Sequence, residues 1–415
     1  MKHDVIVLGA GMVGVGCALH LQALGKRVAL VDRRAPGMET SHGNAGIIQR
    51  EAIAPYALPR GLGFLLSGAT NRRVDVRYQA CDAVRMLGPL WTYHRNSAPD
   101  AYRQITREYE TLIALSLETH AQLMNDADAH HLVAGQGYLM LYRSERELHS
   151  FFEVADERAL DGVNHIKLTG ADVAREEPSL VGRFAGAVRW TDPLAISSPG
   201  DLVQAYARLF EQRGGAVHLG DAGTLRKTDA GGWQVDTAQG PTLEAPQAVV
   251  ALGPWTTQLT ARFGYTAPVI PKRGYHMHYA RLPERPLHST IIDAENGYVI
   301  APMKNGLRLT TGAELANVDS PRAHGQINAA EKLARQSFPL GERVDPEPWM
   351  GTRPCMPDMK PVFGPVPGVP GLWCTFGHGH QGFTLGPVTG ELLAAMMTGM
   401  TPRVDVRPFS PGRFG

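Results

Sequence analysis

The stretch VIVLGAGMVG, residues 5–14, decides the fold of the N-terminal part of this sequence. It opens with four apolar residues, which predict a buried parallel strand, and then turns glycine-rich. Residues 12–24 predict a helix of mostly small and apolar residues that ends at Gly25. Residues 28–31 predict a second buried strand, closed by Asp32. Strand, helix and strand within about 30 residues form a βαβ unit.

The glycines of this turn predict a dinucleotide-binding site. Gly9, Gly11 and Gly14 match the pattern G-x-G-x-x-G, and Asp32 follows Gly9 by 23 residues. Gly9 allows the tight turn, Gly11 lets backbone N–H groups approach a pyrophosphate, and Gly14 lets the helix lie close to the strand. Asp32 is expected to accept hydrogen bonds from a ribose 2′-hydroxyl, which argues against a 2′-phosphate and therefore against NADP.

A second G-x-G-x-x-G match occupies residues 377–382, GHGHQG, between a predicted strand at 371–376 and a predicted helix at 386–397. No acidic residue closes a following strand, so this turn does not predict a second complete dinucleotide site. A helix that starts near Gly386 would carry partial positive charge at its N-terminus. A reduced flavin accumulates negative charge at its pyrimidine edge, so one flavin dinucleotide could be held at both ends by the two turns.

Composition narrows the class of protein. The chain has 415 residues, 43% of them hydrophobic and 20% charged, with a formal net charge of +1, which is ordinary for a globular protein and does not favour a nucleic-acid partner. We expect no signal peptide and no membrane span, because no apolar run approaches about 20 residues. These features predict a cytoplasmic protein and leave peripheral contact with the inner membrane open.

Cysteine and histidine spacing favours neither disulfides nor a metal site. The four cysteines are scattered, without a C-x-x-C pair, at Cys17, Cys81, Cys355 and Cys374. The pairs His276/His278 and His378/His380 have H-x-H spacing without a nearby cysteine or acidic cluster, so we expect surface or pocket histidines and no metal.

The rest of the chain alternates between α/β segments and segments with antiparallel strands. Residues 105–123 have helical periodicity, and residues 201–213 predict a helix with Asp201 as its N-cap. Strands are expected at 137–144 and within 247–255, and residues 273–315 predict successive antiparallel strands. The α/β style returns at the C-terminal end, which predicts two domains assembled from discontinuous segments.

Several motifs together resemble the D-amino-acid oxidase/dehydrogenase superfamily (DAO family) of FAD enzymes, closest to the bacterial D-amino acid dehydrogenases. They are GAGMVG with Asp32, the S-x-x-N-A-G loop at residues 41–46, SPGDLVQAYARLFEQRGGAV from residue 198, VVALGPW from 249, GTRPCMPDMKPVFG from 351 and GHGHQGFTLGPVTG from 377. The resemblance covers nearly the whole chain.

The resemblance implies a mixed α/β fold. A Rossmann-like FAD-binding domain of the glutathione-reductase type would comprise residues 1–60, 198–262 and 346–415. A substrate-binding domain with a large antiparallel sheet would comprise residues 61–197 and 263–345.

The resemblance also implies an activity. The enzyme would be an FAD-dependent oxidoreductase acting on CH–NH or CH–NH2 donors in amino acid catabolism, deaminating D-amino acids oxidatively to an imine and then a 2-oxo acid. The alternatives are a dehydrogenase of D-hydroxyproline or another cyclic secondary amine, and a glycine- or sarcosine-type amine oxidase. The electron acceptor would be a quinone or oxygen. A flavin monooxygenase, an NAD-dependent dehydrogenase or a flavoprotein without catalysis explains fewer of the motifs.

The candidate catalytic residues follow from the same resemblance. Arg353 aligns with the arginine that clamps the substrate carboxylate in several relatives, and a guanidinium can hold a carboxylate bidentately. Tyr275 and Tyr298 are candidates at the mouths of substrate-domain strands, or else core or rim residues. His378 is a near-flavin candidate by position, together with His42 and His380, that could take the proton of the substrate ammonium.

The expected cofactor is non-covalent FAD, because Cys355 lies about four positions too close to Asp358 to match the cysteine that attaches flavin in sarcosine-type relatives. The predicted cofactor-binding residues are Gly9, Gly11, Met12, Val13, Gly14, Asp32, Arg33, Ser41, Asn44, Ala45, Gly46, Gly253, Trp255, Gly379, His380, Gly382, Phe383 and Thr384.

Overall fold

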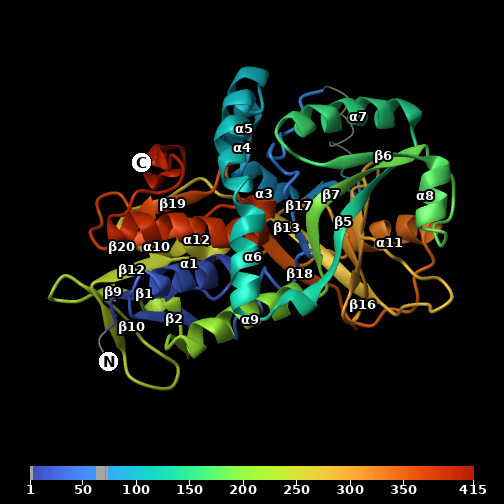
Figure 1. Cartoon of the computed structure of the whole chain (residues 1–415). Coiled ribbons are helices and arrows are strands. Elements are labelled where there is room, and N and C mark those ends of the chain that lie inside the picture. Colours follow the sequence, from blue (N-terminus) through green and yellow to red (C-terminus); the bar gives the residue numbers. More distant parts are fainter. Residues whose placement is uncertain (1–2, 62–70, 72) are drawn as a thin grey trace.

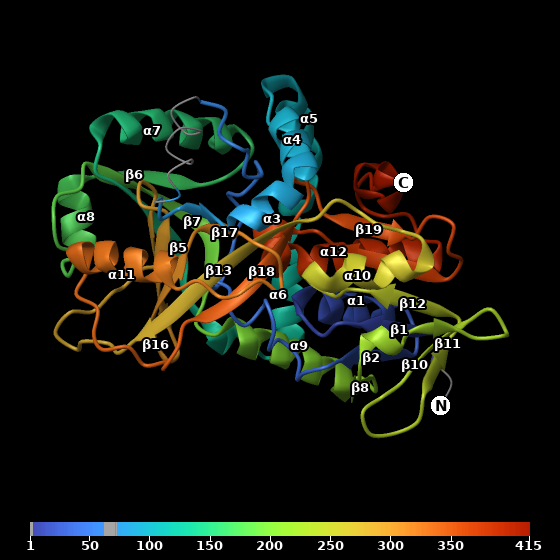
Figure 2. The same cartoon turned by 180° about the vertical axis from the view of Figure 1, so that it is seen from behind.

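The computed structural model describes residues 3–61, 71 and 73–415. Two large sheets lie next to each other along the molecule, and both chain ends lie beside the smaller of them (Figure 1). The reverse view shows the same arrangement, with α7, α8 and α11 gathered around the larger sheet (Figure 2). The fold is the expected mixed α/β one. In the described residues, no helix is both long and apolar enough to cross a membrane.

The smaller sheet, called here the cofactor sheet, has six strands. Their order is β19 (Val362–Pro365), β20 (Leu372–Phe376), β12 (Gln247–Val250), β1 (Val5–Leu8), β2 (Val28–Asp32) and β8 (Ala216–Leu219). All neighbours are parallel except β19 and β20. The strands predicted around the two glycine turns are thus confirmed, and β12 lies between them.

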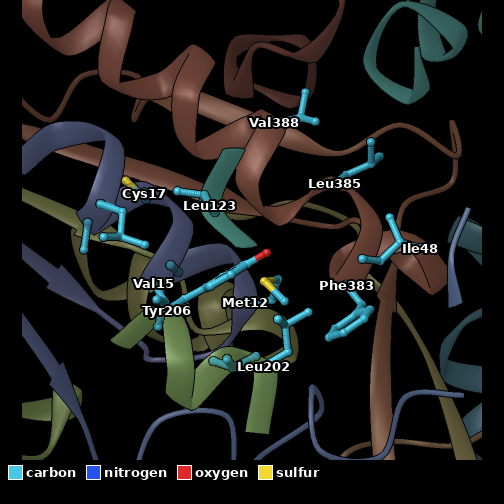
Figure 3. Packing of buried hydrophobic residues seen from close by; sticks show 14 of the residues in the cluster. Met12, Val15, Cys17, Ile48, Leu123, Leu202, Tyr206, Phe383, Leu385 and Val388 are labelled. Carbon is cyan, nitrogen blue, oxygen red and sulfur yellow. The ribbon is translucent and has the colours of Figure 1, made fainter. Parts of the chain in front are cut away.

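Two glycine-rich helices pack on this sheet. Helix α1 (Met12–Ala23) and helix α12 (Gly382–Thr398) cross closely. A Cβ atom at Gly390 would lie only 2.6 Å from the backbone nitrogen of Cys17, so the glycine permits this approach. Both helices contribute to one hydrophobic core with α9 (Pro199–Gln212) and α6 (Ser116–Asp126). Figure 3 shows Met12 of α1, Tyr206 of α9 and Leu123 of α6 among the residues of this core.

The larger sheet has eleven strands. Nine follow the order β3 (Ile47–Ile48), β7 (Gly186–Ile196), β5 (Val133–Tyr142), β14 (Ile291–Asp293), β15 (Tyr298–Met303), β16 (Gly306–Thr311), β13 (Ile270–Tyr279), β17 (Ala313–Leu315) and β4 (Val76–Tyr78). Strand β18 (Trp349–Cys355) pairs with β13, and β6 (His165–Thr169) pairs with β7. The strands between β13 and β16 are antiparallel, as predicted. A separate small sheet has the order β11 (Leu243–Ala245), β10 (Trp233–Val235) and β9 (Arg226–Lys227).

The remaining helices are α3 (Ala80–Arg85), α4 (Leu87–Asn96), α5 (Pro99–Ile113), α7 (Glu145–Leu160), α8 (Gly170–Glu176), α10 (Thr256–Thr260) and α11 (Gly325–Ser337). The helical periodicity of residues 105–123 spans two helices, α5 and α6, which are separated by Ala114 and Leu115. The predicted cap of α9 is wrong: Ser198 is the N-cap, and its hydroxyl accepts a hydrogen bond from the amide of Asp201.

The predicted domain boundaries stay a prediction. Two strands inside the segments assigned to the cofactor domain, β3 and β18, pair within the larger sheet. Segments assigned to the cofactor domain therefore also contribute strands to the larger sheet.

Candidate active site

A cavity of about 1120 Å³ is lined by segments of both sheets. Its lining includes the first glycine turn, the loop at residues 39–45, the face of β13 and β18, and the second glycine turn. The two G-x-G-x-x-G turns, about 370 residues apart in the sequence, therefore border one space.

The first glycine turn has the geometry expected of a pyrophosphate cradle. Gly9 has a φ of 106°, and a Cβ atom there would lie 2.4 Å from the carbonyl oxygen of Ala251. A Cβ atom at Gly14 would lie 1.8 Å from the carbonyl oxygen of Gly9, so only glycine lets α1 approach β1 this closely. The first turn of α1 contains no acidic residue, so its N-terminus can accept an anion.

Asp32 lies at the end of β2 and lines the cavity. One carboxylate oxygen accepts from the amide of Ala10 at 2.6 Å, and the other accepts from the amide of Arg34 at 3.0 Å. Burial raises the pKa of Asp32, and these amide donors act against that shift. Arg33 lies over the ring of Trp255 at 4.4 Å and also lines this end of the cavity, which suits the adenosine part of a dinucleotide.

The loop at residues 41–46 is held from both sides. The Ser41 hydroxyl accepts a hydrogen bond of 3.1 Å from the amide of Met12, which ties the loop to the start of α1. From the larger sheet, Arg308 donates to the carbonyls of His42 at 2.9 Å and Asn44 at 2.6 Å. Sequence reasoning missed Arg308, and no local motif marks it.

The second glycine turn leads into α12 four residues earlier than predicted. Helix α12 begins at Gly382, not near Gly386, and Pro387 lies inside it. Proline lacks the N–H that would donate to the carbonyl of Phe383. The Nε2 of His120, from α6, contacts that carbonyl at 3.0 Å and takes the place of the missing donor. The first turn of α12 has no acidic residue and no side-chain cap, so its N–H groups remain available to an anionic edge at the cavity.

Most of the predicted cofactor-binding residues line the cavity. They are Gly9, Gly11, Met12, Val13, Asp32, Arg33, Ser41, Asn44, Ala45, Gly253, Trp255, Gly379, His380, Gly382 and Phe383. The other three, Gly14, Gly46 and Thr384, are not part of the lining. Gly14 and Gly46 permit close backbone approaches, and the Thr384 hydroxyl accepts from the amide of Gln49 at 3.2 Å.

Arg353 lines the cavity from β18. Its guanidinium donates to the carbonyl of Gly312 at 2.8 Å and contacts the carbonyl of Thr311 at 3.4 Å. Among the residues described, no carboxylate forms an ion pair with it. The guanidinium lies over Gly274 of β13, where a Cβ atom would be 2.4 Å from the Arg353 Nη2.

The two tyrosine candidates are placed differently from Arg353. Side chains alternate between the faces of a strand, and Tyr275 lies on the face of β13 opposite to Gly274. Its hydroxyl donates to Glu314 at 2.7 Å and accepts from the amide of Ala323, and it does not line the cavity. Tyr298 borders the cavity but is only 1% exposed and packs in the hydrophobic cluster under the larger sheet.

The histidines near the second turn are neutral at neutral pH. Burial lowers the pKa of His378 to about 3, and its Nε2 contacts the Thr389 hydroxyl at 2.9 Å. The pKa of His380 is lowered well below its ordinary value, mainly by burial and also by the positive charges of Arg353 and Lys272. Both residues line the cavity, whereas His42 does not.

The H-x-H pair on β13 lies beside Asp345 and Arg308. Ligand atoms of His276, His278 and Asp345 lie within 4.8 Å of one another. However, the Nδ1 of His278 contacts Asp345 at 2.7 Å, and its Nε2 receives a hydrogen bond of 3.0 Å from Arg308. The positive charge of the Arg308 guanidinium beside these nitrogens repels a metal cation. Asp345 and His278 therefore serve to position Arg308.

Sequence reasoning also missed Lys272 and Gly274, which line the cavity. Their signal is the period of two in a strand: residues 272, 274 and 276 of PKRGYH share one face, whereas Tyr275 belongs to the other.

Comparisons with known proteins agree with this geometry. The sequence model of the family described as "DAO: FAD dependent oxidoreductase" matches residues 4–396. The chain is 29% identical to a D-amino acid dehydrogenase from Methylobacterium nodulans, covering 99% of each chain. It is 31% identical to a D-amino acid dehydrogenase from Cereibacter sphaeroides, covering 97% of this chain and 93% of that one. Glycine oxidase from Geobacillus kaustophilus has a similar fold, with a TM-score of 0.74 at 24% identity, covering 99% of this chain and 98% of that one. The chain belongs to the DAO family of FAD-dependent oxidoreductases.

Proposed function

We propose that this protein deaminates D-amino acids oxidatively, with non-covalently bound FAD. The observation that carries the proposal is Arg353, a cavity-lining guanidinium without a carboxylate partner among the described residues, beside the loops suited to a flavin. Such a group can hold the carboxylate of an amino acid bidentately. The names of the D-amino acid dehydrogenases to which the chain is similar support the same substrate class.

The cavity suits FAD at both ends. The first glycine turn and the start of α1 would hold the pyrophosphate, Asp32 the ribose, and the start of α12 the pyrimidine edge of the ring. None of the four cysteines, all of which lie in the described residues, lines this cavity, which favours non-covalent binding. When bound, FAD supplies at N5 the acceptor for the hydride that leaves the amine-bearing carbon.

The residues of this chain would then orient the substrate. Arg353 would fix the carboxylate, so that the bond from the α-carbon to hydrogen points at the ring. The substrate must lose its ammonium proton before hydride leaves, and His380, which lines the cavity with Arg353, would be a candidate to take up that proton. The hydride would carry both electrons away from the amine-bearing carbon, and the loss of one proton from nitrogen would leave the imine. Water then converts the imine into a 2-oxo acid and ammonia.

Anaerobic reduction of the bound flavin tests the proposal. The purified protein should be yellow and release its flavin on denaturation, and a D-amino acid should bleach it in the absence of oxygen while its L-enantiomer does not. Hydroxyproline isomers, glycine and sarcosine test the alternative substrates. Quinone analogues and air, added afterwards, test the two candidate acceptors.

Variants of Arg353 test the clamp. Arg353→Ala should keep the flavin and lose about 100-fold or more in the reduction rate at low substrate, because a charged hydrogen-bonded pair is lost. Arg353→Lys should recover only part of the rate, since a lysine cannot bind bidentately. Arg322→Ala removes an exposed arginine and serves as the control. Normal bleaching by Arg353→Ala would refute the clamp.

A further inference from the structure

A buried cation, Lys272, lies beside Arg353. Lys272 is 9% exposed, lines the main cavity and also borders a smaller cavity behind it. Its ammonium donates to the Tyr93 hydroxyl at 3.2 Å and lies 4.4 Å from the centre of the Tyr93 ring. The Tyr93 hydroxyl in turn donates to the carbonyl of Tyr56. Tyr93 thus supplies both the hydrogen-bond acceptor and the aromatic ring that contact this ammonium.

Lys272 and Arg353 are direct neighbours across the sheet. They form a register pair between the antiparallel strands β13 and β18. Side chains opposite each other in such a pair lie on one face, with Cβ atoms about 4.5–5.5 Å apart, and like charges in this position destabilise a sheet. Both charges also act on the same imidazole, that of His380.

The opposite face of β13 shows how this fold treats a buried cation elsewhere. Arg273, the next residue along, is fully buried and pairs with Glu314 at 2.8 Å. It also donates to the carbonyls of Ser320 and Pro321. Within the described part of the chain, no carboxylate pairs with either Lys272 or Arg353. A buried charge without a counter-ion is costly, so the buried Lys272 beside the partly buried Arg353 at one cavity wall indicates that the missing anions arrive with the ligand.

We propose that the preferred substrate is an amino acid with a second carboxylate, a D-amino acid of the aspartate or glutamate type. The proposal rests on the proposed function and assigns Arg353 to the α-carboxylate and Lys272 to the side-chain carboxylate. Lys272 is a specificity-determining residue in this account. The surrounding wall includes Leu58, Leu90 and Tyr93, whose apolar surface strengthens the attraction between these charges and the substrate.

Substrate pairs that differ only in charge test the inference. D-Glutamate and D-glutamine have nearly the same shape, as do D-aspartate and D-asparagine. In the wild-type holoenzyme, anaerobic flavin reduction should show kcat/KM at least about tenfold higher for one of the acids than for its amide. Amides that react as fast as both acids would overturn the inference while leaving the proposed function intact.

The variant Lys272→Met keeps the length of the side chain and removes its charge. The ratio of kcat/KM for the acid to kcat/KM for its amide should fall at least about tenfold, toward one. Lys332→Met, at an exposed lysine, is the matched control. An unchanged preference in Lys272→Met would overturn the role of Lys272.

Ligand binding gives a readout that does not need turnover. Succinate and glutarate should perturb the flavin spectrum at concentrations at least about tenfold lower than propionate and butyrate, and only when Lys272 is present. If no D-amino acid is oxidised at all, the proposed function fails, and this titration alone decides on the cation pair. Equal binding of mono- and dicarboxylates would refute the pair.

Discussion

At the scale of single residues, the position of Arg353 at the substrate end of the cavity depends on a glycine, Gly274. Gly274 leaves the space above β13 in which the guanidinium of Arg353 lies. The atoms that a Cβ would meet belong to the flexible end of Arg353 and not to the backbone. A methyl group at this position should therefore displace the guanidinium without disturbing the strand.

We predict that Gly274→Ala folds and binds FAD normally but loses about 10- to 100-fold in kcat/KM, because misplacement of a clamp by about 1 Å costs this much. Steady-state kinetics with the best substrate, together with the flavin content, checks this result. Gly135→Ala, on β5 where a Cβ meets nothing within 4 Å, is the control. Full activity in Gly274→Ala would show that the position of Arg353 does not matter.

At the scale of elements, the two helices that start at the glycine turns are locked together. Gly390 of α12 lies against the backbone of Gly16 and Cys17 in α1, and Gly386 lies against Met12 at the start of α1. Because the helices touch by backbone, their N-termini keep a set distance. A change that pushes α1 and α12 apart should therefore increase the distance between the two helix N-termini that would hold the FAD.

We predict that Gly390→Ala lowers stability by about 1–3 kcal/mol, since the new methyl group meets backbone atoms that cannot move aside. The melting temperature should fall, and the dissociation constant for FAD should rise. Gly88→Ala, in α4 where space is open, should be neutral or stabilising. Unchanged melting and flavin retention in Gly390→Ala would mean that the crossing can adapt.

At the scale of the whole molecule, the packing buries neutral histidines. Burial lowers the pKa of His120 from 6.5 to about 4 and that of His378 to about 3. His120 links α6 to the start of α12 through Phe383 and contacts the Tyr206 hydroxyl of α9 at 3.1 Å. Below pH 6.5 the unfolded chain takes up protons that these folded-state histidines do not, so their contribution to stability is lost as the pH falls.

We predict that His120→Gln weakens the dependence of stability on acid. As the pH falls from 7.5 to 5.0, each such histidine lowers the free energy of unfolding by about 2 kcal/mol. The variant lacks one of these histidines. The fall in melting temperature over this range should be smaller in His120→Gln than in the wild type. The comparison between the two proteins is needed because burial raises the pKa of Glu51, which acts in the opposite direction. Equal falls in both would contradict the assignment.

The sequence by itself determined the strands beside the two glycine turns, the turns themselves and the family. A G-x-G-x-x-G turn between a strand and a helix is local, because its geometry depends on glycines within a few residues of one another. Asp32 could be found at its spacing, and Arg353 through the motif around it. The predicted start of α12 failed because the helix runs through Pro387, and the Phe383 carbonyl that the proline leaves without a donor contacts His120, 263 residues away in the sequence.

Only the tertiary structure decided which side chains meet at the substrate end. Tyr275 and Lys272 lie three residues apart on β13, and the packing of the two sheets determines which face becomes the cavity wall. Whether a cation is paired or unpaired depends on carboxylates that distant segments bring near it, as Glu314 is brought to Arg273. Local sequence patterns determine backbone geometry. Burial and charge pairing depend on segments from the whole chain, and substrate specificity depends on burial and charge pairing.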